Sequence, residues 1–322
     1  MKKKSIASKI IKEYGIILVL IITVIIFSCL KEKFRTVSNF LTILKQTAPV
    51  CICSIGMCFV LITGGINLSV GFMESATCMI CGVMMVWWGW NPVISVFIVF
   101  LIMMLIGSLQ GFVIAKYRVA PFIVTLAFMN ILKGISFIIT GGLNISGLPD
   151  NFCQLGLGSL FGVPIPIYMM LLALFIGYFI LNKMYVGRFF YAIGSNEEAA
   201  RLSGINVKLV KIATYVIGSF FATFAGVVQL ARIKTASPNN GSGIENDIIT
   251  ACVLGGVSMA GGEGKIYQVF VGSMIIAVLN NGLIMCQVSE YWQIIVKGVI
   301  LLFAVIYDMI QKNQKNKVVT ID

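Results

Sequence analysis

Histidine is absent from the sequence, and acidic residues number only 12 among its 322 residues. Without histidine, a chain has neither the commonest metal ligand nor the commonest general acid or base. A nucleotide-binding P-loop is also absent, because Ile266 stands where such a loop needs a serine or threonine after Gly264 and Lys265. With no cluster of acids and no nucleophile–base pair, we expect a chain that is not an enzyme and that binds no metal and no cofactor of its own.

The sequence is low in charge and contains long uncharged runs of apolar residues. Hydrophobic residues make up 59% and charged residues 11% of the sequence, whereas soluble domains average about 45–50% and about 25%. Runs such as YGIILVLIITVIIFSCL (14–30) do not alternate apolar with polar residues, so they are typical of helices and not of a porin-type barrel. The sequence therefore predicts an all-α, multi-pass bundle of membrane-spanning helices.

A single membrane domain is expected over residues 14–310, between cytoplasmic tails at 1–13 and 311–322. The first apolar run is long for a cleaved signal and ends in KEKFR, so it predicts an uncleaved first span. We predict ten spans; loss of the two weakest, the second and the eighth, would leave eight. The predicted spans are 14–30, 43–62, 69–88, 92–115, 120–140, 166–183, 209–230, 247–260, 266–285 and 292–310.

Basic residues, 24 in all, indicate the orientation. With the N-terminus in the cytoplasm, the inside segments hold sixteen of them and the outside segments six. Lysine and arginine concentrate in cytoplasmic loops. This bias predicts that both termini are cytoplasmic, and it explains the net charge of +12 without a nucleic-acid partner.

Two glycine-rich breaks, TGGINLSVG (63–71) and LGGVSMAGGEG (254–264), each place Val-Leu before Gly-Gly between apolar runs. One interpretation is an inverted repeat of two halves with a translocation pathway near its interface; the other is coincidence in a glycine-rich chain. Asn67 is either a pathway contact or the corner of a broken helix. The candidate pathway residues are Gly64, Gly65, Asn67, Ser69, Gly71, Gly255 and Gly256.

A short polar island, GRFFYAIGSNEEAARLSG (187–204), interrupts the apolar runs. Ser195 and Glu198 fit a capping box, Glu197 and Arg201 stand four apart in the favourable order, and Gly204 can end the helix. Two helical turns do not persist alone in water. We therefore expect this helix to dock, either on its own membrane domain or on another protein.

A few polar side chains fall inside the predicted spans. Structural neutralisation by a partner is one explanation for each, and Glu74 with Lys133 is a candidate pair. A proton relay would need more acids in the spans than the sequence has. The candidate intramembrane polar residues are Glu74, Gln110, Lys133 and Lys297.

The chain resembles the permease subunits of ribose-type sugar ABC importers over residues 36–310. The resemblance rests on TGGINLSVG (63–71), APFIVTLAFMNILKGISFIITGG (120–142), GRFFYAIGSNEEAARLSGINVKLVK (187–211), LGGVSMAGGEG (254–264) and LNNGLI (279–284). It implies a translocation pathway for a simple sugar, delivered by an extracytoplasmic binding protein and driven by a separate ATPase that binds ATP and Mg²⁺. It also implies a homodimer or pseudo-dimer in the inner or plasma membrane of a prokaryote.

The resemblance further implies that segment 187–211 couples the permease to its ATPase. Where the family usually has Asp, this chain has Asn67, a change that affects preference or gating. Glu245 and Asp247, before the eighth span, are either first-turn acids of a helix or contacts for the binding protein. The residues that match the coupling motif are Gly187, Arg188, Gly194, Asn196, Glu197, Ala199, Arg201, Leu202, Ser203, Gly204 and Ile205.

Other functions stay open on the residues. A permease for nucleosides or branched-chain amino acids is one alternative, because those systems are distantly similar and the apolar or weakly polar pathway residues do not discriminate between the substrates. A stand-alone secondary carrier or channel would transport without an ATPase. A membrane-embedded enzyme lacks a plausible set of catalytic side chains.

Overall fold

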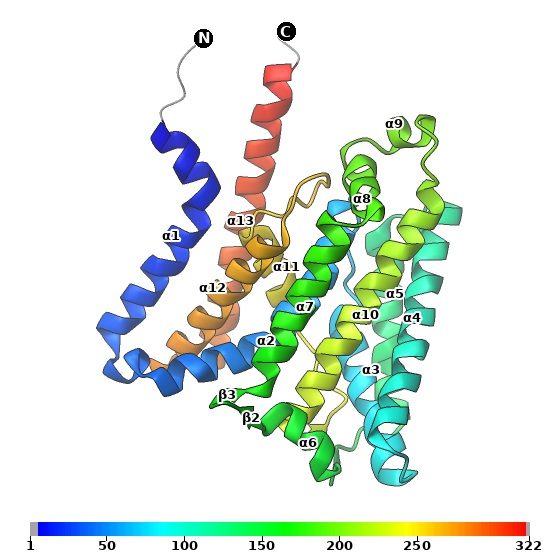
Figure 1. The fold of residues 1–322 in the computed structure, drawn as a ribbon, viewed down its shortest axis with the longest axis vertical. Coiled ribbons are helices and arrows are strands. Elements are labelled where there is room, and N and C mark those ends of the chain that lie inside the picture. The colour runs from blue at the N-terminus through cyan, green and yellow to red at the C-terminus, as the bar shows by residue number, and fades with distance from the viewer. Residues whose placement is uncertain (1–5, 320–322) are drawn as a thin grey trace.

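A computed structural model describes residues 6–319 as a helix bundle with two small two-stranded sheets (Figure 1). Residues 1–5 and 320–322, including Lys2–Lys4 of the predicted tail, lie outside the described residues; 6–13 and 311–319 continue the first and last helices. The helices are α1 (Ile6–Leu30), η1 (Glu32–Arg35), α2 (Val37–Ile62), α3 (Val70–Gly82), η2 (Val83–Trp87), α4 (Pro92–Tyr117), α5 (Pro121–Ile138), α6 (Asp150–Leu157), α7 (Ile165–Asn182), α8 (Tyr185–Ser195), α9 (Glu197–Leu202), α10 (Val207–Ile233), α11 (Ile244–Leu254), α12 (Ile266–Met285) and α13 (Glu290–Val319).

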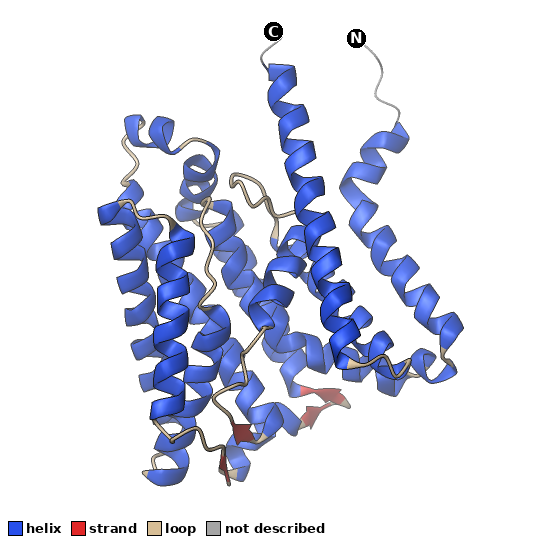
Figure 2. Cartoon of the chain, turned by 180° about the vertical axis from the view of Figure 1, so that it is seen from behind, coloured by secondary structure: helices blue, strands red, loops and turns tan. Residues whose placement is uncertain are grey.

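Two strand pairs mark one end of the bundle, which we call the hairpin end. β1 (Ile145–Ser146) pairs antiparallel with β4 (Thr235–Ala236), and β2 (Ser159–Leu160) forms a hairpin with β3 (Val163–Pro164). Figure 2 shows these strands at the end opposite the two chain termini. Helices α8 and α9 lie at the same end as the termini, at the top of Figure 1, and we call this the coupling end. The shared end agrees with both termini lying on one side, but which side faces the cytoplasm stays a prediction.

Eight helices within the described part of the chain are long and apolar enough to cross a membrane. The predicted second span is one of them, because α2 extends to 26 residues. The first predicted span forms the shorter apolar helix Gly15–Leu30. The all-helical membrane class is therefore confirmed, and the count of ten spanning helices is not.

The eighth predicted span, 247–260, is wrong as a continuous helix. α11 has 11 residues, or about 16 Å of helix. It ends at Leu254 because Gly255 and Gly256 follow, and Gly256 adopts a φ of 82° that other residues rarely take. The chain still passes from the hairpin end at β4 to the coupling end, since Gly262 bonds to the end of α2 there. This pass is made by a non-helical stretch, 237–243, followed by α11.

Helix α10 lies at the centre and packs on α2, α3 and α4. Its approach to α4 is close because α4 carries Gly107 and Gly111, four residues apart. A methyl group on Gly107 would lie 2.7 Å from the Tyr215 carbonyl oxygen, and one on Gly111 would lie 2.7 Å from the Ile212 Cα. Small residues at this spacing let membrane helices approach each other closely. The core thus fixes α10, which carries the island at its N-terminal end.

Candidate functional site

The polar island forms two helices, α8 and α9, at the coupling end. α8 is amphipathic: its face with Gly187, Phe190 and Ile193 is buried. The Phe190 ring meets Phe59 of α2 edge-on, with ring centroids 5.6 Å apart. The predicted docking of the island on its own membrane domain is therefore observed, through α8.

The short helix α9 begins at a different cap from the predicted one. Asn196 is the N-cap, and its Oδ1 accepts from the Ala199 N–H at 3.0 Å. Ser195 was the predicted cap, but it is the last residue of α8 and has no capping bond. Gly204 follows α9 with a φ of 84°, as the predicted stop requires.

The charged side chains of α9 also choose other partners. Glu197 accepts from the Lys211 ammonium at 2.6 Å, and Arg201 pairs with Glu198. The predicted Glu197–Arg201 pair is therefore wrong, because Lys211 on α10 approaches Glu197 across the turn between the helices. This ion pair ties α9 to the first turns of α10.

The outer face of α9 is open. Ala200 is its one buried residue, and Leu202 is 82% exposed at its C-terminal end. The charged outer face of α9 and the Leu202 side chain are thus left uncovered by the rest of the chain. Among the predicted coupling residues, those exposed here are Arg188, Asn196, Glu197, Ala199, Arg201, Leu202, Ser203 and Gly204, whereas Gly187 is buried and Gly194 and Ile205 are half-buried.

Both glycine-rich breaks meet the island at one joint. The Gly262 N–H donates to the Ile62 carbonyl at 2.9 Å, which joins the second break to the end of α2. Gly194 of α8 lies against this bond, since a methyl group placed on it would lie 2.5 Å from the Gly262 nitrogen. Only a glycine at 194 permits three backbone segments to meet this closely. We call Ile62, Gly194 and Gly262 the glycine joint.

Three further hydrogen bonds hold the segments around the joint together. The Tyr191 hydroxyl of α8 donates to the Gly264 carbonyl at 2.6 Å, and burial raises the pKa of Tyr191 to about 12. From the other side, Asp308 of α13 accepts from the Ser258 hydroxyl at 3.2 Å and the Met259 N–H at 3.1 Å. Direct contacts at the joint thus connect α8 with α2 and with the second break, and the second break with α13.

The first break is a closed corner. Asn67 and Ser69 are fully buried, and Asn67 Oδ1 accepts from the Ser69 N–H at 3.0 Å and the Ser69 hydroxyl at 2.6 Å. Gln110 of α4 donates to that hydroxyl at 2.8 Å. These hydrogen bonds are the ones expected if Asn67 forms the corner of a broken helix. Its role as a pathway contact stays a prediction.

The remaining candidate pathway residues lie in three separate places. Gly64 lies beside Gly261 near the glycine joint, and Gly65 lies against the Tyr215 hydroxyl. Gly255 and Gly256 lie beside Gln268 at the start of α12. Gly71, in contrast, lies at the start of α3 against Gly241, in the non-helical stretch before α11.

The intramembrane polar residues do not form the suggested pair. Glu74 is fully buried and has no hydrogen-bond partner among the residues that the structure describes. Lys133 instead lies over the Phe72 ring, 5.6 Å from its centroid. Lys297 does have an acid partner: its ammonium donates to Asp247 at 2.9 Å.

The sequence did not predict the two side chains that bond to the segments around the glycine joint, Tyr191 and Asp308. Asp308 is an acid inside an apolar run, which by itself signals a buried contact. Tyr191 carries no such signal, because its partner is a backbone carbonyl 73 residues away. Within residues 6–319, no group of three or more Cys, Asp or Glu side chains is placed to hold a metal ion.

Eight helices long and apolar enough to cross a membrane, a discontinuous pass and a projecting helix pair at one end define a multi-pass membrane protein. The chain belongs to the permease family described as the branched-chain amino acid transport system permease component, which it matches over residues 39–305. None of the solved structures matches the chain.

Its relatives among characterised proteins are import permeases. The chain is 38% identical over 300 residues to the ribose import permease protein RbsC of Escherichia coli K12, covering 91% of this chain and 92% of that protein. It is 39% identical over 302 residues to the RbsC of Bacillus subtilis 168, covering 93% of each. It is 33% identical over 298 residues to the D-allose permease AlsC of E. coli K12, covering 92% and 91%. The predicted family is thereby confirmed, as is the prediction that the chain is not an enzyme.

Proposed function

We propose that the chain forms the sugar pathway of an ATP-driven importer, with a pentose or related simple sugar as its substrate. The predicted function, membrane subunit of a sugar importer, agrees with the similarity of the chain to ribose, allose and xylose permeases. In this proposal the chain works in a prokaryotic plasma membrane as a homodimer or pseudo-dimer. An extracytoplasmic binding protein delivers the sugar at the hairpin end.

A separate cytoplasmic ATPase supplies the energy, and ATP and Mg²⁺ bind to that subunit. The observation that supports this division is the open face of α9, with Leu202 exposed beside charged side chains. α9 is the docking helix in this proposal, and α8 carries its movement into the glycine joint. Rigid-body shifts of packed helices are a common means of such transmission.

Pull-down of the ATPase tests the docking. Replacing Glu197 and Arg201 by alanine should weaken co-purification and abolish ATP-dependent uptake, while the permease stays folded. The matched control is Lys208→Ala, a change of an exposed residue on the first turn of α10. If co-purification of the double variant equals that of wild type, α9 is not the docking helix.

A second candidate substrate follows from the family's description, which names branched-chain amino acids. Reconstitution with ATPase and binding protein distinguishes the two. Labelled ribose should be taken up, and unlabelled xylose and allose should reduce this uptake whereas leucine should not. That result supports a sugar as the substrate. Uptake by the chain alone, driven by an ion gradient, would overturn both and identify a secondary carrier.

A further inference from the structure

The stretch before α11 reaches the middle of the bundle as a non-helical chain. At its outer end, a methyl group on Gly82 of α3 would lie 2.9 Å from Ala236 Cβ. At its inner end, Gly71 of α3 lies against the Gly241 carbonyl, and the Gly241 N–H donates to Ser75 at 2.7 Å. The α3 segment between these glycines rises about 16 Å, roughly half of a 30 Å bilayer core.

Polar groups are exposed at this depth. Ser242, Gly243 and Asn246, at the start of α11, are exposed in the structure. Non-helical backbone at membrane depth is tolerated where it lies inside protein or lines a water-filled space, and not against lipid. The exposed face at the start of α11 therefore borders water or a second subunit.

Beside this face lies a polar cluster from three helices, α11, α12 and α13. Asp247 accepts from Lys297 at 2.9 Å and from the Asn280 amide at 3.4 Å. The Asp247 and Lys297 side chains are 14% and 26% exposed, so the ion pair is reached from outside but largely sheltered. Asn280 Oδ1 is buried and has no hydrogen-bond partner within the described chain.

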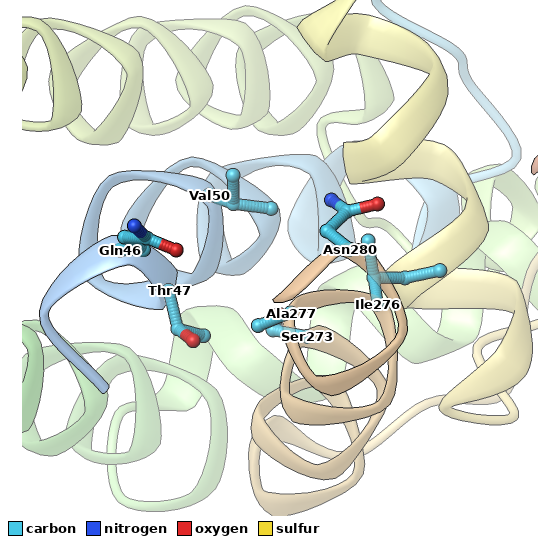
Figure 3. Close-up of a pocket in the computed structure, with 7 residues that line it drawn as sticks. All are labelled: Gln46, Thr47, Val50, Ser273, Ile276, Ala277 and Asn280. Carbon is cyan, nitrogen blue, oxygen red and sulfur yellow. The ribbon is translucent and has the colours of Figure 1, made fainter. Parts of the chain in front are cut away.

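A small cavity adjoins the cluster between α2 and α12. Its volume is about 50 Å³, and Asn280 lies at its wall together with Gln46, Thr47 and Ser273 (Figure 3). Thr47 and Ser273 donate their hydroxyl protons to their own helices. Their oxygens are thus left as acceptors toward the cavity. A cavity needs about 10–15 Å³ of such space to hold one water molecule, so this cavity admits water and needs α2 and α12 to separate before it admits a sugar.

We propose that Asp247, Asn280 and Lys297 are the contact point at which the pathway holds the hydroxyl groups of the sugar. This inference rests on the proposed function and names its site. The cluster combines carboxylate and amide acceptors with amide and ammonium donors, as a polyol requires. Its two charges compensate each other, which suits an uncharged ligand. An amino acid, in contrast, would have to open the ion pair.

Water access is tested by cysteine labelling in the complete importer. The background carries Cys29→Ser and Cys286→Ser, because the other seven cysteines are buried. A charged methanethiosulfonate reagent should modify Asn246→Cys. It should not modify the control Leu105→Cys, an exposed position in the middle of α4. An Asn246→Cys variant that stays unmodified overturns the proposal.

Sugar contact is tested by the number of sugars moved per ATP hydrolysed in proteoliposomes. Asn280→Ala should lower this ratio about tenfold, the effect of one hydrogen bond of about 1.4 kcal/mol, while ATPase activity stimulated by the binding protein is retained. The control is Asn281→Ala, since Asn281 accepts from Asn39 at 3.1 Å, away from the cluster. It should leave the ratio unchanged even where it lowers the melting temperature.

The isosteric Asn280→Asp is the second variant, in case Asn280→Ala does not assemble. It keeps the shape but repels Asp247, and it should lower the same ratio. A wild-type ratio in the assembled Asn280 variants overturns the contact point. Absence of ATP-dependent uptake by the wild-type importer would instead overturn the proposed function, so the two failures are distinguishable.

Discussion

Replacing Gly194 by alanine should separate the three backbones of the glycine joint. The new methyl group would overlap the Ile62 carbonyl oxygen and would lie 2.5 Å from the Gly262 nitrogen. Non-bonded heavy atoms rest about 3.5 Å apart, so α8 must move by more than about 1 Å. That movement also stretches the Ile62–Gly262 hydrogen bond, which is 2.9 Å long.

The cost of this change follows from its parts. Inserting a methyl group into a packed site costs about 1–3 kcal/mol, and leaving a buried backbone group unpaired costs about 1–3 kcal/mol. The better helix propensity of alanine returns about 1 kcal/mol. The net loss is about 1–5 kcal/mol, and its midpoint of about 3 kcal/mol shifts the equilibrium of the joint toward its opened form by a factor of roughly 150.

Transport and ATPase binding are then measured side by side in proteoliposomes. We expect sugar uptake by Gly194→Ala to fall at least about tenfold, while the ATPase still co-purifies because α9 is untouched. Gly134→Ala is the matched control, since a methyl group there has no heavy atom within 4 Å. Wild-type uptake per ATP in Gly194→Ala would refute the glycine joint as the route of coupling.

Three further changes probe the same region. Asn196→Ala removes the α9 cap, worth about 1 kcal/mol, and should weaken ATPase binding about fivefold in a pull-down titration; equal affinity would contradict the capping role. Tyr191→Phe removes the bond to Gly264 and should lower uptake. Because the pKa of Tyr191 is about 12, the phenol keeps its proton between about pH 6 and 9. The ratio of wild-type uptake to variant uptake should therefore stay constant over this pH range. A ratio that falls with rising pH would contradict the role of the protonated hydroxyl as a donor. Asp308→Ala leaves the Met259 N–H unpaired, which costs about 1–3 kcal/mol, and should lower the melting temperature; an unchanged melting temperature would show that the contact carries no stability.

The helical class and the position of the island were predictable because both depend on local sequence. Uncharged runs of sufficient length form spans wherever they stand, and Gly204 ends α9 by its own backbone freedom. The cap was not predictable from the island alone. Ser195 and Asn196 are both good caps, and α8, which extends through Ser195, decides between them.

The partners of the charged residues depend on the tertiary structure. Glu197 pairs with Lys211 because the turn after α9 brings α10 back beside it, and no helical spacing rule covers a separation of 14 residues. Likewise, the sequence marks Lys297 as a buried cation but does not reveal that Asp247, 50 residues earlier, is its partner. The sequence shows the two glycine breaks as a pair, but their contact with Gly194 depends on the tertiary structure.

The discontinuous eighth pass has a consequence for how the protein enters the membrane. With 11 helical residues and two acids in its first turn, α11 is a poor substrate for insertion as an independent segment. Its preceding stretch finds hydrogen-bond partners on α3, such as Ser75. Because α3 is synthesised earlier, we expect the N-terminal helices to assemble first. We expect α11 to enter the membrane only afterwards, by packing against that preformed surface.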